Sequence, residues 1–429
     1  MIASMSETRE LTAKDAAARL GVKVETLYAY VSRGMLERRR AVDGRTSLFD
    51  AADVDALAQR HRRTPERGGL EVVIDTGLTS LDDGRLRYRG LDAADLSRTK
   101  SFEWVAEWLW LGDDAPAPPE VPWASSVKSA ELIAEEVAGL PASATPGDRL
   151  RVAAAVAGAT HSLRHDLRPT GVAHSGRRLI ATMVDSLPPR QRHKVPALDL
   201  PEQPLAPDAL AVRLWPRLGT RRASAHLIRT LNAALVLLAD HELAASTLAA
   251  RVAASTRADP YAVVSSGLGV LSGSLHGTAS VPVQRLLAEV AAVDVTDLDL
   301  VGSVVSDHLR HRSQVPGFGH RLYPDGDPRA AALLDLVRSP EVDSDRLAVV
   351  EAVLTVMTEG APVPPNVDFG LAALAHVAGC DIGAGEAIFA VARSAGWIAH
   401  AIEEYSEPGN RFRARARYVG PSNRRRVDE

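Results

Sequence analysis

A histidine and an arginine lie close together in the segment 315–329. The sequence Gly-Phe-Gly-His at 317–320 ends in His320, and glycine allows the backbone to come close to a ligand. The sequence Asp-Pro-Arg at 327–329 is typical of a helix start, with aspartate as the N-cap and proline in the first turn. An arginine fork can hold a carboxylate, and an imidazole can polarise a carbonyl. The loop could therefore bind both groups of one ligand; the alternative is a surface turn without a common role.

Two more histidines occupy positions at which an imidazole can do chemistry. His241 follows an apolar helix and lies between Asp240 and Glu242. His276 precedes a helix expected over 281–290, and the positive end of a helix dipole lowers a histidine pKa and favours the neutral ring. A neutral imidazole can donate a hydrogen bond to a carbonyl that is becoming an enolate. A single histidine is more often a satisfied surface or core residue than a catalyst, so each of the two, taken alone, favours the structural interpretation.

A carboxylate and several arginines complete the candidate set. Asp368 follows a Pro-Pro-Asn turn and has apolar neighbours, and a carboxylate in such a setting can act as a base toward carbon acids. Arg393 and four arginines within 411–417 lie further along the chain, where the four could also form a solvated face. The sequence has no metal-ligand spacing, no phosphate-binding loop and no Gly-x-Ser-x-Gly motif, so we expect no bound metal.

The elements that must position these residues are expected to be helices. Aromatic residues make up only 4% of the chain while alanine and leucine are abundant, which favours a mostly α fold. Asp-Gly at 83–84 predicts a small hairpin, and the proline-rich segment 187–208 predicts a mobile surface loop or an eroded insertion. The apolar spacing and capping signals predict helices over residues 101–112, 126–140, 146–164, 175–186, 209–218, 223–238 and 281–290.

Composition limits the classes of protein to consider. A chain of 429 residues can form two or three domains, and its net charge of -4 implies no global affinity for nucleic acid or anionic membranes. No apolar run reaches the roughly 20 residues that span a bilayer, and we expect no signal peptide. One cysteine, Cys380, excludes an internal disulfide and a four-cysteine zinc site, so a reducing cytoplasm is the expected compartment.

Residues 1–67 are expected to form a separate small domain. A helix over 11–20, a turn with glycine and a helix over 25–33 follow the helix-turn-helix pattern. A hairpin turning at Asp-Gly 43–44 and a third helix over 50–60 come next. This order resembles the winged helix-turn-helix of the MerR/excisionase type.

The charge of this small domain makes DNA a possible partner. It has 13 Lys+Arg against 10 Asp+Glu, whereas the remainder has 37 against 44, and the segment 64–69 reads as the linker between them. The alternative is a module for assembly or packing, because a charge of +3 is modest for a DNA-binding domain. The arginines expected to meet DNA are Arg33, Arg38, Arg39, Arg40 and Arg45.

Taken together and in order, the motifs between about residues 70 and 420 resemble the citrate synthase family. The matching segments are Tyr-Arg-Gly-Leu-Asp at 88–92, Ala-Asp-His-Glu-Leu at 239–243, Ser-Leu-His-Gly at 274–277, Gly-Phe-Gly-His-Arg-Leu-Tyr at 317–323, Asp-Pro-Arg at 327–329, Pro-Asn-Val-Asp-Phe at 365–369, Ala-Arg-Ser-Ala-Gly-Trp-Ile-Ala-His at 392–400 and Arg-Ala-Arg-Ala-Arg-Tyr-Val-Gly at 413–420. Eight motifs in the right order make this a specific resemblance.

The resemblance implies a mostly α-helical homodimer with citrate-synthase-like large and small domains. We expect the large domain over 68–267 and 371–429, and the small domain over 268–370. The family condenses acetyl-CoA with oxaloacetate, which implies no permanently bound cofactor and an acyl-CoA cosubstrate. The relative that makes 2-methylcitrate from propionyl-CoA stays open as an alternative.

The resemblance also implies roles for single residues. Asp368 would take a proton from the acetyl methyl group, His276 would stabilise the enol, and His320 would polarise the ketone of oxaloacetate. The carboxylates of oxaloacetate would be held by His241, Arg329, Arg393 and, in the active site of the other subunit, Arg413. The loop residues expected next to the cosubstrate are Gly317, Phe318 and Gly319.

The sequence departs from the family pattern at three places near these residues. Ala244 replaces the usual asparagine after the Asp-His-Glu motif, Ser280 lies in an altered stretch after His276, and Ala414 replaces the usual proline after Arg413. These changes put substrate choice or rate in question. A second hypothesis is therefore a weakly catalytic regulator that senses CoA or oxaloacetate and binds DNA through residues 1–67.

Overall fold

The computed structural model describes residues 10–20, 27–28, 30–31, 36, 38–41, 46–51, 53–54, 73–114, 123–125, 127–190, 205–312, 314–360 and 363–420. The chain divides into two compact units, Met1–Asp75 and Thr76–Glu429. The predicted linker at 64–69 lies outside the described residues, as do Arg33 and Arg45.

The first unit holds a three-stranded antiparallel sheet and a short helix. Its strands β1 (Glu10–Thr12), β2 (Arg39–Arg40) and β3 (Ser47–Asp50) pair in the order β1-β3-β2. Helix α1 (Ala13–Leu20) starts after Thr12, whose hydroxyl accepts a hydrogen bond from the Asp15 amide. This unit has a small hydrophobic core of its own, formed by Ala16, Ala17, Leu20, Leu27, Tyr30, Leu36, Phe49 and Val54.

The second unit begins with a small sheet made of β4 (Thr79–Asp82), β5 (Arg85–Tyr88) and β6 (Leu91–Asp92). The predicted turn between β4 and β5 is confirmed, because Asp83 and Gly84 both have positive φ, as a tight hairpin turn requires. The buried Tyr88 hydroxyl donates to the Val236 oxygen at 3.0 Å, near the end of α10 (Ala225–Leu238). The sheet is thereby fixed to the helix that leads to His241.

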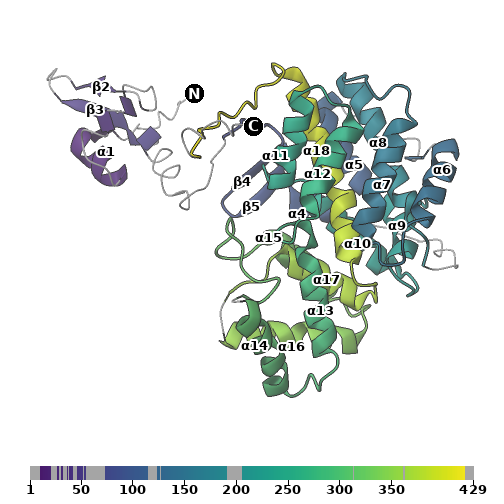
Figure 1. Ribbon diagram of the computed structural model, residues 1–429. Helices are drawn as coiled ribbons and strands as arrows, with labels where there is room; N and C mark the ends of the chain where they lie inside the picture. The colour runs from purple at the N-terminus through teal and green to yellow at the C-terminus, as the bar shows by residue number, and fades with distance from the viewer. Residues whose placement is uncertain are drawn as a thin grey trace, which may run out of the picture. The chain divides into compact units, whose positions relative to one another are not determined.

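Helices form the rest of this unit, in agreement with the mostly α prediction (Figure 1). Those before α10 are α4 (Ala93–Thr99), α5 (Phe102–Leu111), α6 (Val127–Ala138), α7 (Pro146–Ala159), α8 (Pro169–Ser186) and α9 (Leu210–Leu218). Those after it are α11 (Ala245–Ser255), α12 (Pro260–Leu271), α13 (Ser280–Val290), α14 (Leu298–Arg312), α15 (Pro328–Val337), α16 (Ser344–Gly360), α17 (Val367–Val377) and α18 (Ala384–Ser406).

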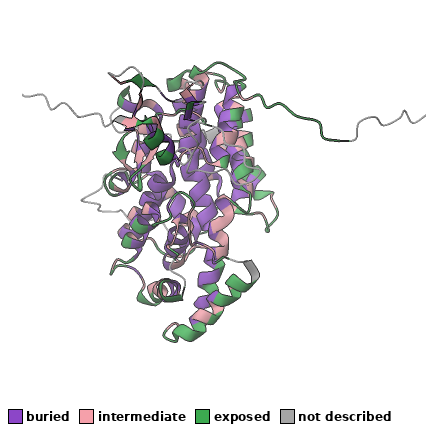
Figure 2. Ribbon diagram, turned by 90° about the vertical axis from the view of Figure 1, so that its left-hand side faces the viewer, coloured by how far each residue is buried: buried purple, intermediate pink, exposed green. Residues whose placement is uncertain are grey.

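Helix α18 is the centre of the core. It contacts α5, α7, α8, α10, α11 and α12, and most of its 23 residues are buried. Buried residues, drawn in purple, are concentrated in the inner helices of the unit (Figure 2). Packing this close requires glycine where helices cross: a Cβ at Gly267 of α12 would lie 2.5 Å from the Trp397 ring of α18. Among the described residues, no helix combines the length and apolar character needed to cross a membrane.

Two predicted boundaries were wrong. Helix α8 starts at Pro169 rather than at 175, because proline fits the first turn of a helix, and Gly176 lies inside the helix, where it allows close packing against the Trp110 ring. Helix α7 ends at Ala159, five residues before the predicted end. The proline-rich segment 187–208 is anchored at both ends by the buried Leu187 and Leu205, so these ends do not fit the predicted surface loop; residues 191–204 lie outside the described part.

Candidate active site

The predicted glycine loop has the unusual backbone that its sequence indicates. Gly317 and Gly319 have φ values of +85° and +78°, which side chains other than glycine adopt rarely. The loop is held against the start of α17: the Asn366 amide donates to the Gly317 oxygen at 2.9 Å, and the Asn366 side chain donates to the Gly319 oxygen at 2.8 Å. The Phe318 ring packs on that of Phe369, with centroids 4.9 Å apart. The loop that carries His320 is therefore fixed beside Asp368.

Asp327 caps α15 as predicted and also aims Arg329. Its carboxylate accepts from the Arg329 amide, from Nε at 2.9 Å and from Nη2 at 2.7 Å. The Asp327 oxygen that accepts from Nη2 also accepts from the Val367 amide at 2.9 Å. This bond joins α15 to the start of α17. These bonds leave Nη1 of the buried Arg329 without a hydrogen bond among the described residues, so it can reach a ligand.

His241, His320 and Arg329 meet around one tyrosine. The Tyr323 hydroxyl lies 3.0 Å from His241 Nε2. The ring centroids of His241 and His320 are 5.6 Å apart, and the Arg329 guanidinium lies over the Tyr323 ring at 5.5 Å. Sequence reasoning did not single out Tyr323, although it belongs to the Gly-Phe-Gly-His-Arg-Leu-Tyr motif. Its spacing of three residues from His320 was the available signal.

Arg393 approaches the same region from α18. It is 1% exposed, its Nε donates to the Leu238 oxygen at 2.9 Å, and its guanidinium lies over the Phe389 ring at 4.8 Å. His276 lies on the other side of Phe389, with the two ring centroids 6.0 Å apart. Phe389 thus lies between an arginine and a histidine that sequence reasoning linked only through the family resemblance. We call His241, His276, His320, Arg329 and Arg393 the histidine cluster.

The hydrogen bonds of the two candidate catalytic histidines define their tautomers. Ser246 accepts from the Trp397 indole at 3.3 Å, so its own hydroxyl can donate to His276 Nε2 at 2.7 Å, which places the ring proton on Nδ1. In His320, Nδ1 accepts from the Leu322 amide at 3.2 Å, which places the proton of a neutral ring on Nε2. Each ring therefore presents an N–H that can donate to a substrate oxygen.

The electrostatic environment keeps these imidazoles neutral. Burial, with Arg393 nearby, lowers the pKa of His276 to about 4. Burial and Arg329 lower the pKa of His320, and burial with Arg329 and Arg393 lowers that of His241 well below its ordinary value. Neutral histidines can donate to a carbonyl without bringing more positive charge next to two arginines.

Asp368 has the opposite shift. It lies in the first turn of α17, where the Asn366 side chain caps the helix. Burial raises the pKa of Asp368 to about 6, although Arg329 opposes the shift. A carboxylate with a pKa near the working pH is suited to removing a proton from a weak carbon acid.

Arg413 does not join this cluster within one chain. It lies in the exposed segment that follows α18, without a hydrogen bond or ion pair to any described residue. In the first unit, Arg38, Arg39 and Arg40 are exposed on and beside β2. The structure therefore brings together six of the seven predicted catalytic and substrate-binding residues.

Two of the departures from the family pattern lie beside the cluster. Ala244 occupies the N-cap position of α11 and offers no side-chain hydrogen bond to that helix. Ser280, at the start of α13, has a buried hydroxyl without a partner among the described residues. Both are changes in local hydrogen bonding close to the cluster, and neither removes one of its charged groups.

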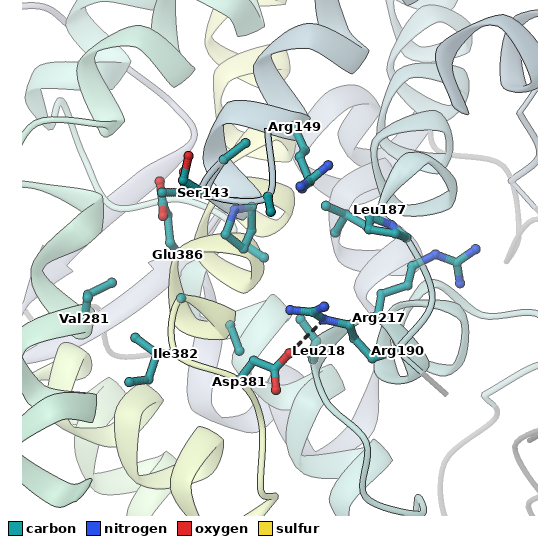
Figure 3. A pocket seen from close by; sticks show the side chains of 18 of the residues that line it. Ser143, Arg149, Leu187, Arg190, Arg217, Leu218, Val281, Asp381, Ile382 and Glu386 are labelled. Atoms are coloured by element: carbon teal, nitrogen blue, oxygen red, sulfur yellow. Dashed lines mark ion pairs between the residues drawn. The ribbon is translucent and has the colours of Figure 1, made fainter. Parts of the chain in front are cut away.

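A cavity of about 500 Å³ lies elsewhere in this unit, between the starts of α7, α13 and α18 and the end of α9 (Figure 3). None of the predicted site residues lines it. Two of its arginines already have partners: Arg190 pairs with Asp381 at 2.8 Å, and Arg149 donates to the Val137 oxygen at 2.8 Å. The chemistry predicted from the sequence therefore belongs to the histidine cluster.

Comparisons with known proteins agree with this geometry. Residues 69–415 match the family model described as citrate synthase, C-terminal domain, and residues 10–62 match that of a helix-turn-helix domain. The chain is 31% identical over 381 residues to citrate synthase 2 of Bacillus subtilis, which covers 84% of this chain and 97% of the relative. It is 30% identical over 383 residues to 2-methylcitrate synthase 2 of Corynebacterium glutamicum, covering 84% and 96%.

Solved structures resemble the chain over the same range. The citrate synthase of Thermotoga maritima superimposes with a TM-score of 0.65 at 26% identity and covers 85% of this chain and 98% of its own. The citrate synthase of Thermoplasma acidophilum, solved as a ternary complex with carboxymethyl coenzyme A and oxaloacetate, also gives a TM-score of 0.65 at 25% identity, covering 83% and 96%.

Proposed function

Because this chain belongs to the citrate synthase family, and carries a helix-turn-helix domain ahead of the enzyme part, we propose that it condenses acetyl-CoA with oxaloacetate to citrate and free CoA. The observation that carries the proposal is the set of two neutral histidines and a carboxylate of raised pKa beside two buried arginines. A regulator that only binds its ligands has no need of a carbon-acid base.

Oxaloacetate is the ligand that the arginines and His241 would hold. The free nitrogens of Arg329 and Arg393 would pair with its carboxylates, since arginine forks match the planar carboxylate group. The Nε2–H of His320 would donate to its ketone oxygen and make the carbonyl carbon more electrophilic. Asp327 would support this binding by fixing the direction in which Arg329 points.

The acetyl group would be activated between Asp368 and His276. Asp368 removes a methyl proton while the Nδ1–H of His276 donates to the thioester oxygen, so that no full negative charge develops there. The carbon–carbon bond then forms to the ketone carbon of oxaloacetate, and water hydrolyses the thioester. Gly317, Phe318 and Gly319 would border the cosubstrate, where the absence of two side chains lets it approach the backbone.

Arg413 is proposed to complete the site of a partner subunit in a homodimer. Its position in an exposed segment, away from the site of its own chain, supports this assignment. The proposed compartment is a reducing cytoplasm, which the single cysteine supports.

The identity of the acyl-CoA is the finer question. Propionyl-CoA is the alternative cosubstrate, and the similarity to a 2-methylcitrate synthase supports testing it beside acetyl-CoA. An acyl group longer by one methylene changes binding in an apolar pocket by about 1–3 kcal/mol, so the ratio of kcat/KM values discriminates the two.

The test is thiol release from acetyl-CoA or propionyl-CoA, with and without oxaloacetate. We expect release that depends on oxaloacetate, and a loss of about 10²–10⁴-fold in kcat for Asp368→Asn with oxaloacetate still bound. The variant Cys380→Ser serves as control, because it removes the protein's own thiol from the readout. Turnover of Asp368→Asn within a few-fold of the parent would sink the assignment of the base.

The second candidate is a regulator that senses CoA or oxaloacetate, favoured by the helix-turn-helix domain. It would release little or no thiol under these conditions. Binding of oxaloacetate or CoA to the chain would instead change its affinity for DNA.

A further inference from the structure

A chain of buried polar groups starts at the residue before His241. Asp240 accepts a hydrogen bond from the Thr79 hydroxyl at 2.5 Å and lies 3.2 Å from His400 Nε2. On its other side, His400 Nδ1 lies 2.9 Å from Arg251 Nη1. Since arginine can only donate, Nδ1 accepts, and the proton of a neutral His400 ring on Nε2 is directed at Asp240.

This series of buried polar groups continues from Arg251 to the segment after α18. Arg251 donates to Glu403 at 2.8 Å and to Glu404 at 3.0 Å. Glu404 in turn accepts both Nε and Nη2 of Arg411, each at 2.6 Å. Burial by itself would raise the pKa of Glu404, but Arg411 and Arg251 hold it below its ordinary value. Glu404 therefore remains ionised between its two arginines at working pH.

Stability alone is a weak reason for such an arrangement. Asp240, His400 and Glu404 are 0% exposed and Arg251 is 1% exposed. Removing charges from water is costly, and well-packed apolar residues often stabilise a protein equally well. A buried charged chain does, however, hold groups in one geometry, because any displacement leaves a charge without its partner.

The two ends of the chain lie at two different parts of the proposed chemistry. Asp240 precedes His241, and its negative charge acts on the guanidinium of Arg393. Arg411 lies two residues before Arg413, in the segment 407–420 that we call the arm. The base of the arm is fixed to the end of α11, since the Asn410 amide donates to the Ser255 oxygen at 2.8 Å.

We propose that Asp240, His400, Arg251, Glu404 and Arg411 form a positioning chain that couples two active sites. At one end it fixes His241 and Arg393 for oxaloacetate in its own subunit. At the other end it fixes the arm that presents Arg413 to the partner subunit. This inference rests on the proposed function, and thiol release by the unaltered protein tests that function separately.

The first experiment removes the hydrogen bonds that link the positioning chain to the arm. Arg411→Ala should raise the KM for oxaloacetate at least about tenfold with a smaller effect on kcat, because an arm that has lost its two charge-assisted hydrogen bonds to Glu404 no longer holds Arg413 in one position. Arg417→Ala is the matched control, since Arg417 is an exposed arginine of the same arm without a hydrogen bond or ion pair to the described residues. Equal KM values for the two variants would overturn the proposal.

The second experiment assigns the effect to a subunit. Each variant is reassociated with Asp368→Asn subunits. In a mixed dimer, the base Asp368 is then present only in the active site of the variant subunit. For Arg411→Ala that site receives Arg413 from an intact arm, and its KM should return to the parent value. For Glu404→Gln, the positioning chain is still interrupted within the subunit that holds the intact Asp368. The KM of that subunit's site should therefore stay raised.

The outcomes separate coupling from a purely structural role. Complete rescue of Glu404→Gln in the mixed dimer would overturn the coupling of the two sites, as would a lowered melting temperature with an unchanged KM. If Glu404→Gln does not form dimers, His400→Gln changes the link between Asp240 and Arg251 and takes its place in the same design.

Discussion

At the scale of single residues, Asp368 and His276 have pKa shifts in opposite directions for the same physical reason. Burial disfavours the charged form of both, which raises the carboxyl pKa to about 6 and lowers the imidazole pKa to about 4. Between these two values the carboxyl group is still protonated while the imidazole is already neutral. Above pH 6, the site holds a free base beside a neutral donor, which is the state that enolisation requires.

This arrangement predicts one acid limb in the pH profile. The kcat/KM for acetyl-CoA should fall as the pH drops through about 6, because protonated Asp368 cannot accept a methyl proton. His276 should add no limb above pH 5, since its pKa of about 4 keeps it neutral there. Initial rates between pH 5 and 8 measure both points. A flat profile down to pH 5 would contradict the assignment, and the residual activity of Asp368→Asn should lack this limb.

The sequence predicted the catalytic and substrate-binding residues better than the residues that position them. His320, Arg329 and Asp368 come with local signals, namely glycines, a helix cap and a rigid turn. Asp240 and Phe389 lack such signals, because their importance lies in contacts with residues far away in the sequence. The bond between His400 and Asp240, for example, joins positions 160 residues apart. Such contacts follow only from the packing of α18 against α10 and α11.

At the scale of elements, capping signals were the most reliable guide. Ser101 caps α5 and Asp327 caps α15, as their sequences indicate, whereas Asn366, which was expected only in a rigid turn, caps α17. Glycines were less reliable, because the sequence does not distinguish a glycine that ends a helix from one that lets two helices approach. Gly112 ends α5 with positive φ, whereas Gly176 lies inside α8 against Trp110.

The missing cap of α11 gives a prediction about stability. Ala244 stands at the N-cap with an extended ψ of 158°, and its side chain cannot accept a hydrogen bond from the first turn. Ala244→Asn should raise the free energy of unfolding by about 1 kcal/mol and the melting temperature by roughly 2 °C. Ser224→Ala is the matched opposite, because it removes the cap of α10 that accepts from the Leu227 amide at 3.1 Å. Thermal unfolding of both variants checks the signs; no rise for Ala244→Asn would mean that the asparagine side chain does not reach the helix amides.

At the scale of the whole molecule, the two units have separate cores and different charge. The hydrophobic cluster of the first unit contains none of the residues of the second. Every proposed active-site residue lies within Thr76–Glu429. Removal of residues 1–75 should therefore leave oxaloacetate-dependent thiol release largely intact, and this truncated chain is the control for the experiment on DNA.

We propose that the helix-turn-helix domain of the first unit binds DNA through the exposed arginines on and beside β2. Contacts to phosphate release counterions, so the affinity should fall by about 0.9 log units per log unit of salt for each phosphate neutralised. Changing Arg38, Arg39 and Arg40 together to alanine should weaken binding and flatten this slope, whereas the chain without residues 1–75 should not bind. Fluorescence anisotropy of the full chain with duplex DNA at several salt concentrations gives both quantities. Absence of binding at about 50 mM salt, or binding that the triple substitution leaves unaltered, would exclude this DNA contact and favour a role of the domain in assembly.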